Sequence, residues 1–270
     1  MLLCASNIML ALKQALSLVS MKETSGWMPN NVSNLELWLK DNSLIQADQN
    51  SSGGALDPVH TTTANTMETG DLINIWNDFA GNGYNALQDT EADKPAWNRY
   101  STAFSFTPYF DGFRFMDLDS SLIVSANQDF SIVTEIMFTD VSQNAMYGSD
   151  SSNFFRINSA AGFRCKIGGA GNNNFTEGSD TIAVNTYYTL IFTRSNGATG
   201  DLRLYVNGGG YSDKAWGSTA LTDAEAFTVS NIGSAADDTD NMKGYIKNVI
   251  IYKGTVLTAA ERQLMYTYLT

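Results

Sequence analysis

The chain is poor in the residue types on which much enzymatic chemistry depends. Among its 270 residues there is one histidine, His60, which excludes a metalloprotease of the HExxH type. Its two cysteines, Cys4 and Cys165, are too few for a disulfide scaffold, and we expect two free thiols. No apolar run reaches the roughly 18 residues of a membrane-spanning helix, so we expect no membrane partner.

Charge is also scarce, and positive charge most of all. Charged residues make up 16% of the chain, and the formal net charge is -12. A phosphate backbone should repel such a chain, so we expect no nucleic-acid partner. Hydrophobic residues reach 43% and glycine is frequent, which is typical of one large domain of many strands joined by turns.

Alternating apolar residues predict the strands. Residues 35–40, 130–138 and 187–194 place large apolar side chains at every second position, the pattern of a strand with one face in a core. Thr258 and Glu261 have the spacing of a capping box, which predicts a short helix near the end of the sequence. Together these patterns predict an antiparallel β-sandwich closed by one helix.

Several phrases occur in the order typical of one superfamily. They are NLELWLK at 34–40, the turn at 76–86, FDG at 110–112, LRLYVNG at 202–208 and GYIKNVIIY at 244–252. In these phrases the chain resembles the concanavalin A-like lectin/glucanase (laminin G-like) jelly-roll superfamily. The resemblance implies an all-β antiparallel jelly roll over 34–270. We expect the residues before it, 1–33, to form a helical or extended arm and a linker. Lectins, glycanases and structural modules share this fold, so function has to be argued from sites.

The first 21 residues are apolar at roughly helical spacing. A signal peptide would begin with positive charge, but the first is Lys13, in the middle of the apolar stretch. A helix packed on its own domain and an arm docked on a partner are both compatible with the pattern. We expect an assembly arm, whose apolar contacts come from Leu2, Met9, Leu12, Leu16, Val19 and Trp27.

The overall plan is similar to that of virion proteins of marine tailed bacteriophages. In both, an apolar arm precedes an opening phrase, here Trp27-Met28-Pro29, and then the jelly roll. This resemblance implies a non-enzymatic capsid decoration or surface protein, assembled in the host cytoplasm, with other virion proteins or further copies of itself as partners. The alternative is a carbohydrate-binding adhesion module of the tail-fibre type, and a glycan hydrolase is the less favoured third.

Aromatic residues near the loops are the candidates for carbohydrate binding. Exposed rings stack on sugars, but large aromatics in a sandwich also pack in the core. The candidate sugar contacts are Trp97, Tyr147, Tyr211 and Trp216.

Acidic loops are candidates for calcium, since Ca²⁺ prefers carboxylate and carbonyl oxygens. A solvated turn explains the same residues, and no motif requires a cofactor. The candidate ligands are Asp78, Asn82, Asp237, Asp238 and Asp240.

Paired carboxylates for glycan cleavage are not evident. A retaining glycosidase needs two carboxyl groups about 5 Å apart. Glu91 and Asp93 lie in a polar turn, and Glu135 lies on a strand without an acidic neighbour two residues away. We therefore name no catalytic residue and expect no enzyme, with these side chains as solvated surface carboxylates.

Overall fold

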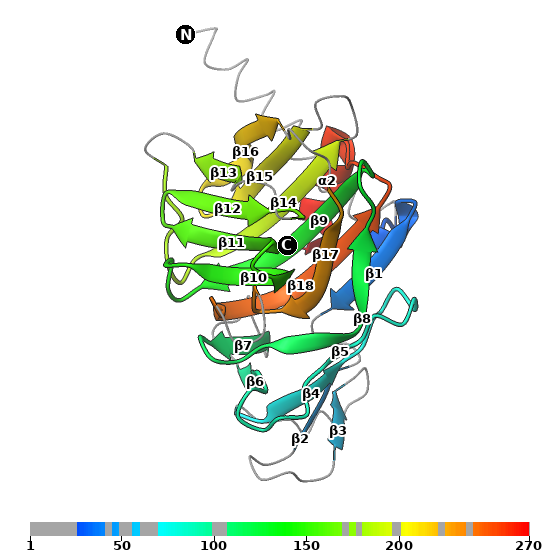
Figure 1. The fold of residues 1–270 in the computed structure, drawn as a ribbon, viewed down its shortest axis with the longest axis vertical. Coiled ribbons are helices and arrows are strands. Elements are labelled where there is room, and N and C mark those ends of the chain that lie inside the picture. The colour runs from blue at the N-terminus through cyan, green and yellow to red at the C-terminus, as the bar shows by residue number, and fades with distance from the viewer. Residues whose placement is uncertain are drawn as a thin grey trace, which may run out of the picture.

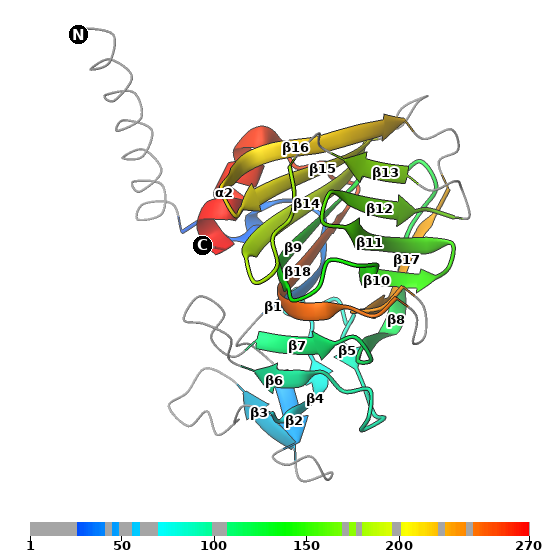
Figure 2. The ribbon, with the colours of Figure 1, turned by 90° about the vertical axis from the view of Figure 1, so that its left-hand side faces the viewer.

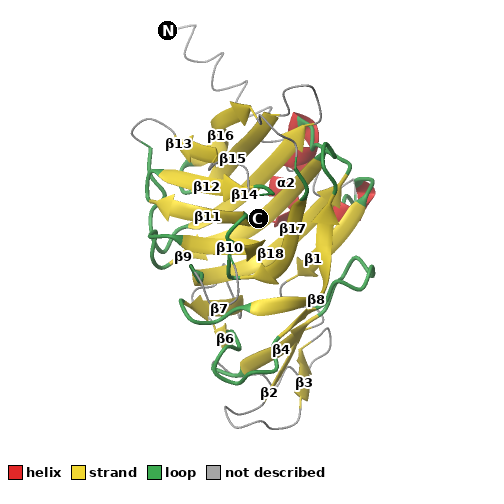
Figure 3. Ribbon diagram, in the orientation of Figure 1, coloured by secondary structure: helices red, strands yellow, loops and turns green. Residues whose placement is uncertain are grey.

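Two antiparallel sheets face each other and form the protein's core (Figure 1). The computed structural model describes residues 26–40, 45–48, 56–59, 70–98, 107–168, 173–176, 180–195, 201–220, 225–235 and 240–269. Strands account for nearly all regular structure in these ranges (Figure 3). No helix among them is long and apolar enough to span a bilayer.

The first sheet has its longest strands at the centre, where neighbours on both sides satisfy the backbone. Every residue of β9 is buried, because one face meets the core and the other is also covered. In spatial order the strands are β16 (Tyr211–Ala220), β15 (Asp201–Gly208), β14 (Tyr187–Ser195), β9 (Phe130–Phe138), β18 (Lys243–Lys253) and β1 (Leu35–Lys40).

The second sheet lies across the core from the first (Figure 2). It continues at one end into short strands that fold away from the sandwich. In spatial order the strands are β13 (Asn173–Thr176), β12 (Gly162–Lys166), β11 (Asn153–Ser159), β10 (Asn144–Asp150), β17 (Phe227–Ile232), β8 (Met116–Val124), β5 (Ala86–Leu87), β4 (Leu72–Trp76), β2 (Ile45–Asp48) and β3 (Leu56–Val59).

Two further strands join the sheets along one side. β7 (Thr107–Asp111) pairs with the start of β18, and β6 (Ala96–Asn98) links β7 to β4. The sandwich is therefore nearly closed, which confirms the predicted all-β jelly roll.

Aromatic side chains fill the space between the sheets. Phe192 from the first sheet stacks on Phe155 from the second, with ring centroids 4.6 Å apart. Phe155 in turn stacks on Phe163 at 5.8 Å. Cys165 lies among them as a free thiol whose pKa is raised by burial, so it stays protonated and unreactive.

The one described α-helix forms a third layer on the outer face of the first sheet (Figure 2). α2 (Ala259–Leu269) begins at the predicted capping box: the Thr258 amide donates to Glu261 Oε2 at 2.7 Å, and the Glu261 amide to Thr258 Oγ1 at 3.3 Å. Met265 packs against Trp38 and Ile250 of the sheet. β1 was expected to have one buried face, but Trp38 on its other face lies under this layer.

Residues just before β1 pack on the same outer face. A 3₁₀ turn, η1 (Pro29–Asn31), is held by the Tyr252 hydroxyl, which donates to the Pro29 carbonyl at 2.9 Å. Trp27 meets Tyr268 of α2 edge to face at 6.1 Å, so this member of the expected arm packs on its own domain. The remaining arm residues Leu2, Met9, Leu12, Leu16 and Val19 lie outside the described ranges.

Candidate functional site

A buried carboxylate lies at the centre of the outer face of the first sheet. Glu135 follows Val133 by two residues on β9 and therefore shares its outward direction, away from the core side chains of Ile132 and Ile136. Its side chain has no exposed surface. In register, Glu135 lies beside Thr189 of β14 and Asn248 of β18.

A β-bulge in β18 brings two side chains to this carboxylate. Ile246 pairs with Ile136 and Asn248 with Glu135, so Lys247 is the extra residue between them. A bulge breaks the alternation of directions, and here it lets consecutive polar side chains reach the same face. Lys247 Nζ lies 2.9 Å from Glu135 Oε1, and the Asn248 amide donates to Oε2.

These contacts compensate for the burial of the charge. A carboxylate removed from water is costly unless a cation and hydrogen-bond donors replace the solvent. Asn248 is itself oriented, because Trp38 Nε1 donates to its Oδ1 at 3.2 Å and leaves its amide group for Glu135. The arrangement is a preset polar floor, in which each group has a fixed direction.

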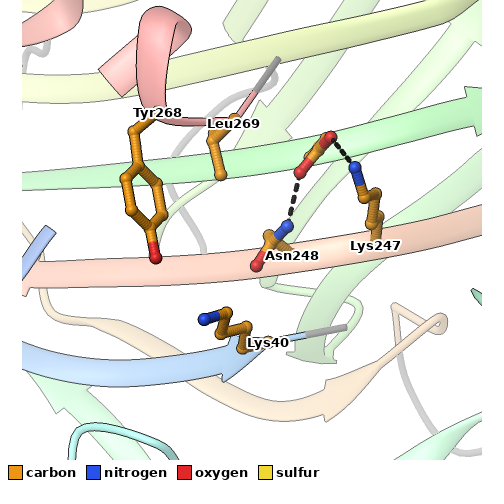
Figure 4. A pocket seen from close by; sticks show the side chains of 6 residues that line it. Lys40, Lys247, Asn248, Tyr268 and Leu269 are labelled. Atoms are coloured by element: carbon orange, nitrogen blue, oxygen red, sulfur yellow. Dashed lines mark hydrogen bonds and ion pairs between the residues drawn. The ribbon is translucent and has the colours of Figure 1, made fainter. Parts of the chain in front are cut away.

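A pocket of about 260 Å³ opens above this floor (Figure 4). Lys40 reaches it from β1, while Tyr268 and Leu269 reach it from the last turn of α2. The lining is charged or polar at its floor and aromatic or apolar at the helix. It consists of Lys40, Glu135, Lys247, Asn248, Tyr268 and Leu269.

Aromatic contacts hold the helix side of the pocket in place. The Tyr268 ring meets Trp38 edge to face at 5.8 Å. Lys40 Nζ lies 5.3 Å from the centroid of the Trp38 ring and 5.0 Å from that of Phe79, which is within cation–π range. The Lys40 ammonium group is thus placed beside the pocket by neutral rings.

A row of tyrosines flanks the polar floor on its other side. Tyr187, Met137, Tyr245 and Tyr109 are successive partners across β14, β9, β18 and β7. They lie two residues along the strands from Glu135, a shift of about 7 Å on the same face. The Tyr109 and Tyr245 rings lie 4.8 Å apart, and Tyr109 and Tyr187 are half-buried. Ring surfaces therefore border the polar floor on two sides.

A family profile described as the concanavalin A-like lectin/glucanases superfamily matches residues 110–261. The chain belongs to this superfamily. The matched segment begins in β7 and ends in α2, and so includes Glu135, both bulge residues and most of the two sheets. No curated protein sequence matches the chain significantly.

Solved structures with the same fold include glycan-active proteins. A family 54 α-L-arabinofuranosidase matches with a TM-score of 0.63 and 12% identity over 87% of this chain. An arabinofuranosidase bound to arabinofuranosyl-α-1,2-xylobiose gives 0.60 and 9% over 87%. Domain 4 of the arabinanase AbnA of Geobacillus stearothermophilus, in complex with arabinotriose, gives 0.50 and 16%, covering 70% of this chain and 91% of that domain. The chain spans 61% and 62% of the two arabinofuranosidases, and such low identities show the fold alone.

Three of the four predicted sugar-binding aromatic residues are buried in the core of the domain. Trp97, Tyr147 and Trp216 have no exposed surface, so the expectation that these rings lie at the surface is wrong. Tyr211 is half-buried: it packs edge to face on Trp216 at 5.9 Å and donates its hydroxyl to the Thr181 carbonyl at 2.9 Å. The core needed large rings at these positions to fill the gap between the sheets.

Two of the predicted calcium ligands, Asp78 and Asn82, lie in one turn and bind backbone groups. Asp78 Oδ1 accepts from the Trp38 and Ala80 amides at 2.9 Å, and its Oδ2 from the Asn82 amide at 2.9 Å, so this carboxylate closes a turn. The Asn82 side chain donates to the carbonyls of Leu35 and Glu36. These two residues therefore serve the backbone of the turn.

Of the other candidate ligands, the structure describes Asp240. Asp240 forms an ion pair with Arg156, whereas Asp237 and Asp238 lie outside the described residues. Within the described ranges, no three acidic, cysteine or histidine side chains are grouped as a metal ion would need. At Asp78, Asn82 and Asp240, a calcium site thus has no geometric support.

The number of carboxylates at the pocket bears on the chemistry around Glu135. Cleavage of a glycosidic bond normally uses two carboxyl groups that flank it. Glu135 is the one carboxylate among the described residues that line the pocket. This carboxylate is fully buried, and it holds the Lys247 ammonium group and the Asn248 amide in fixed directions.

Two patterns in the sequence are typical of this site, although neither predicts that Glu135 is buried. Glu135 was expected to be a solvated carboxylate, which is wrong, since α2 and its neighbours exclude water. The break in alternation at Lys247 and Asn248, two polar residues in succession within an apolar strand, is the sign of a bulge. Tyr187 and Tyr245 lie on the face opposite to their core neighbours, Tyr188 and Ile246.

Proposed function

We propose that this domain binds carbohydrate, and does not cleave it, at the Glu135 pocket and the tyrosines beside it. The observation that carries the proposal is the β-bulge in β18, which holds Lys247 and Asn248 against Glu135 as a preset polar floor. Tyr268 lies on one side of this floor, and the row formed by Tyr187, Tyr245 and Tyr109 lies on the other.

Carbohydrates need this combination of groups. Their hydroxyls require oriented donors and acceptors, while the C–H faces of their rings stack on aromatic surfaces. The pocket offers the Lys40 and Lys247 ammonium groups as donors, with Lys247 held in place by the buried Glu135 carboxylate. The Tyr268 ring lines its helix side, and the tyrosine row lies beside it. The arabinotriose complex of the arabinanase domain with the same fold is consistent with this use of the sandwich.

The test is binding of the full chain to an array of plant and microbial glycans that includes arabino-oligosaccharides, followed by calorimetry with the best ligand. Tyr268→Ala and Tyr109→Ala should each weaken binding about tenfold, because each removes one ring surface. Phe113→Ala is the matched control: Phe113 is 72% exposed and does not line the pocket, so its loss should leave affinity unchanged.

Two results would overturn this function. One is the absence of binding by the wild-type chain to any glycan on the array. The other is an equal loss of affinity in Phe113→Ala and Tyr268→Ala, which would indicate nonspecific apolar adsorption.

The absence of cleavage is part of the proposal. Incubation of the wild-type chain with each bound glycan should release no new reducing ends. Release that disappears in Glu135→Gln would instead make Glu135 a catalytic group and replace binding by hydrolysis.

The virion role expected from the sequence stays a prediction. It depends on the apolar segment over residues 1–25, outside the described ranges, and none of the comparisons supports it. Light scattering of the full chain and of a version that starts at Gly26 tests the assembly arm. The start at Gly26 keeps Trp27 and Pro29, which pack on the domain. A defined oligomer that becomes monomeric on truncation supports the arm, and equal masses contradict self-assembly.

A further inference from the structure

The outer face of the second sheet carries three cations on two neighbouring strands. Arg156 of β11 and Arg164 of β12 are direct partners in register, and Lys166 lies two residues further along β12. Phe155, Phe163 and Cys165, which alternate with them, lie in the core, so the cations point outward. We name Arg156, Arg164 and Lys166 the cationic strip.

Two of these cations differ from most others in the described part of the chain. Most described lysines and arginines form an ion pair with a carboxylate. Those for which the described residues provide no ion pair are Lys40, Arg194, Arg164 and Lys166.

Other groups account for Lys40 and Arg194. Lys40 lies over two aromatic rings, and Arg194 donates to the carbonyls of Ser125, Gln128 and Glu225 at 2.6–2.8 Å. Arg164 donates to a neutral acceptor, Asn174 Oδ1, at 2.9 Å. Arg164 and Lys166 therefore lie side by side without a carboxylate partner among the described residues.

This placement is unfavourable for the fold itself. Like charges directly opposite each other on neighbouring strands destabilise a sheet. Arg156 is compensated by Asp240 and lies over the Phe154 ring at 4.9 Å, and Phe154 is in turn the strand partner of Lys166. The strip thus forms a two-by-two array of three cations and one ring.

A polar recess adjoins the strip. Asp240, the partner of Arg156, also lines a cavity of about 260 Å³ together with Ser142, Gln143, Asn144 and Lys243. Gln143 and Asp240 have positive φ angles of 48° and 52°, a backbone strain that often accompanies functional loops. Hydroxyl and amide groups therefore lie beside the cations, where β10 begins.

We propose that the cationic strip binds carboxylate or sulfate groups of an acidic glycan. An arginine fork matches either anion with two parallel hydrogen bonds, and Lys166, about 7 Å along the strand, would meet a second anionic group. The recess would receive neighbouring hydroxyls. A nucleic acid is disfavoured, because its dense charge would meet the net charge of -12 beyond the strip. This surface lies across the core from the Glu135 pocket and does not depend on the function proposed there.

The experiment measures binding of the full chain to polygalacturonate, dextran sulfate and neutral dextran at low ionic strength. Arg164→Gln combined with Lys166→Gln should lower affinity for polygalacturonate, dextran sulfate or both by about tenfold, and added salt should weaken binding. A loss confined to polygalacturonate identifies carboxylate as the ligand, and one confined to dextran sulfate identifies sulfate.

The control removes the same net charge elsewhere. Arg203→Gln with Lys253→Gln changes two cations of the first sheet that pair with Asp201 and Glu36, and should leave affinity within about twofold. Equal losses in the two double variants, equal binding to neutral dextran, or no binding to either polyanion would overturn the proposal. Tyr268→Ala separates the two surfaces: it should leave polyanion binding unchanged, and loss of that binding would contradict an independent strip.

Discussion

The two outer faces of the sandwich differ in how their charged side chains are buried and paired. On the first sheet, α2 covers the surface and the central carboxylate of Glu135 is fully buried, but Lys247 and Asn248 satisfy it within the fold. On the second sheet, Arg164 and Lys166 are partly exposed, and no described carboxylate pairs with them. A buried charge must be compensated by groups of the protein itself. An exposed charge is solvated by water and remains available to bind a ligand.

The difference indicates two kinds of binding surface. On the first face, the buried network fixes the orientation of the polar groups. Because their partners hold them, these groups point the same way before and after a ligand binds. On the second face, the exposed cations attract anionic ligands. This electrostatic attraction acts over several ångströms and weakens as the salt concentration rises. We therefore expect changes on the first face to affect stability strongly, and changes on the second to affect it little or favourably.

The largest effect should come from Lys247→Met, which leaves the Glu135 carboxylate buried without its cation. Removal of one partner of a buried pair is strongly destabilising, and we expect a loss of about 3 kcal/mol in the free energy of unfolding. Urea denaturation of the variant and the wild type measures it.

Lys253→Met is the matched control for this loss. Lys253 lies on the same strand, but its Nζ is 3.7 Å from Glu36 and both side chains are partly exposed. Its loss should cost less than about 0.5 kcal/mol. Equal costs for the two variants would show that burial does not decide the cost of losing a cation.

A smaller loss of stability is expected at the N-terminus of α2, the helix that covers the first face. Thr258→Ala removes the cap of α2 and should cost about 1 kcal/mol. Because α2 carries Tyr268, the variant should also weaken glycan binding while polyanion binding to the strip persists. Thermal unfolding and both binding assays check this, and an equal loss at both surfaces would contradict their independence.

How far the sequence predicts the molecule depends on the range of the interaction. The capping box of Thr258 and Glu261 and the turn closed by Asp78 involve neighbours in sequence, and their positions could be recognised directly. The strand alternation and the superfamily resemblance likewise predicted the sandwich. Burial of Trp97 and Trp216 could not be predicted in this way, because the same ring suits a surface or a core and only the packed sheets decide.

The candidate site was harder still to predict. Glu135 is buried because α2, more than a hundred residues away in sequence, covers its face of the sheet. The bulge at Lys247 and Asn248 shifts the register of β18, and a shift by one residue exchanges the two faces. Periodicity alone assigned Glu135 to solvent, since it contains no information about the third layer.

On the second face, removal of one cation should increase the stability of the fold. Arg164→Gln relieves the repulsion of Arg156 and keeps an amide near Asn174, so we expect a gain of about 0.5 kcal/mol at low salt. Arg203→Gln, which loses its Asp201 partner, should give no gain. Urea denaturation at low and high ionic strength tests this, and a loss of stability in Arg164→Gln would show that the strip contributes to the fold.

The smallest effect concerns pH at the recess beside the strip. The hydrogen bond from Lys243 lowers the pKa of Asp140, and bonds from Ser142 add to this. A lowered folded pKa contributes stability above the unfolded value and loses it as pH falls through the folded value. Lys243→Met should therefore cost a few tenths of a kcal/mol near pH 6, because the pair is exposed, and nothing near pH 2. Unfolding curves across this range measure the difference. A cost that persists at pH 2 would mean that Lys243 stabilises the fold by packing, and not by its charge beside Asp140.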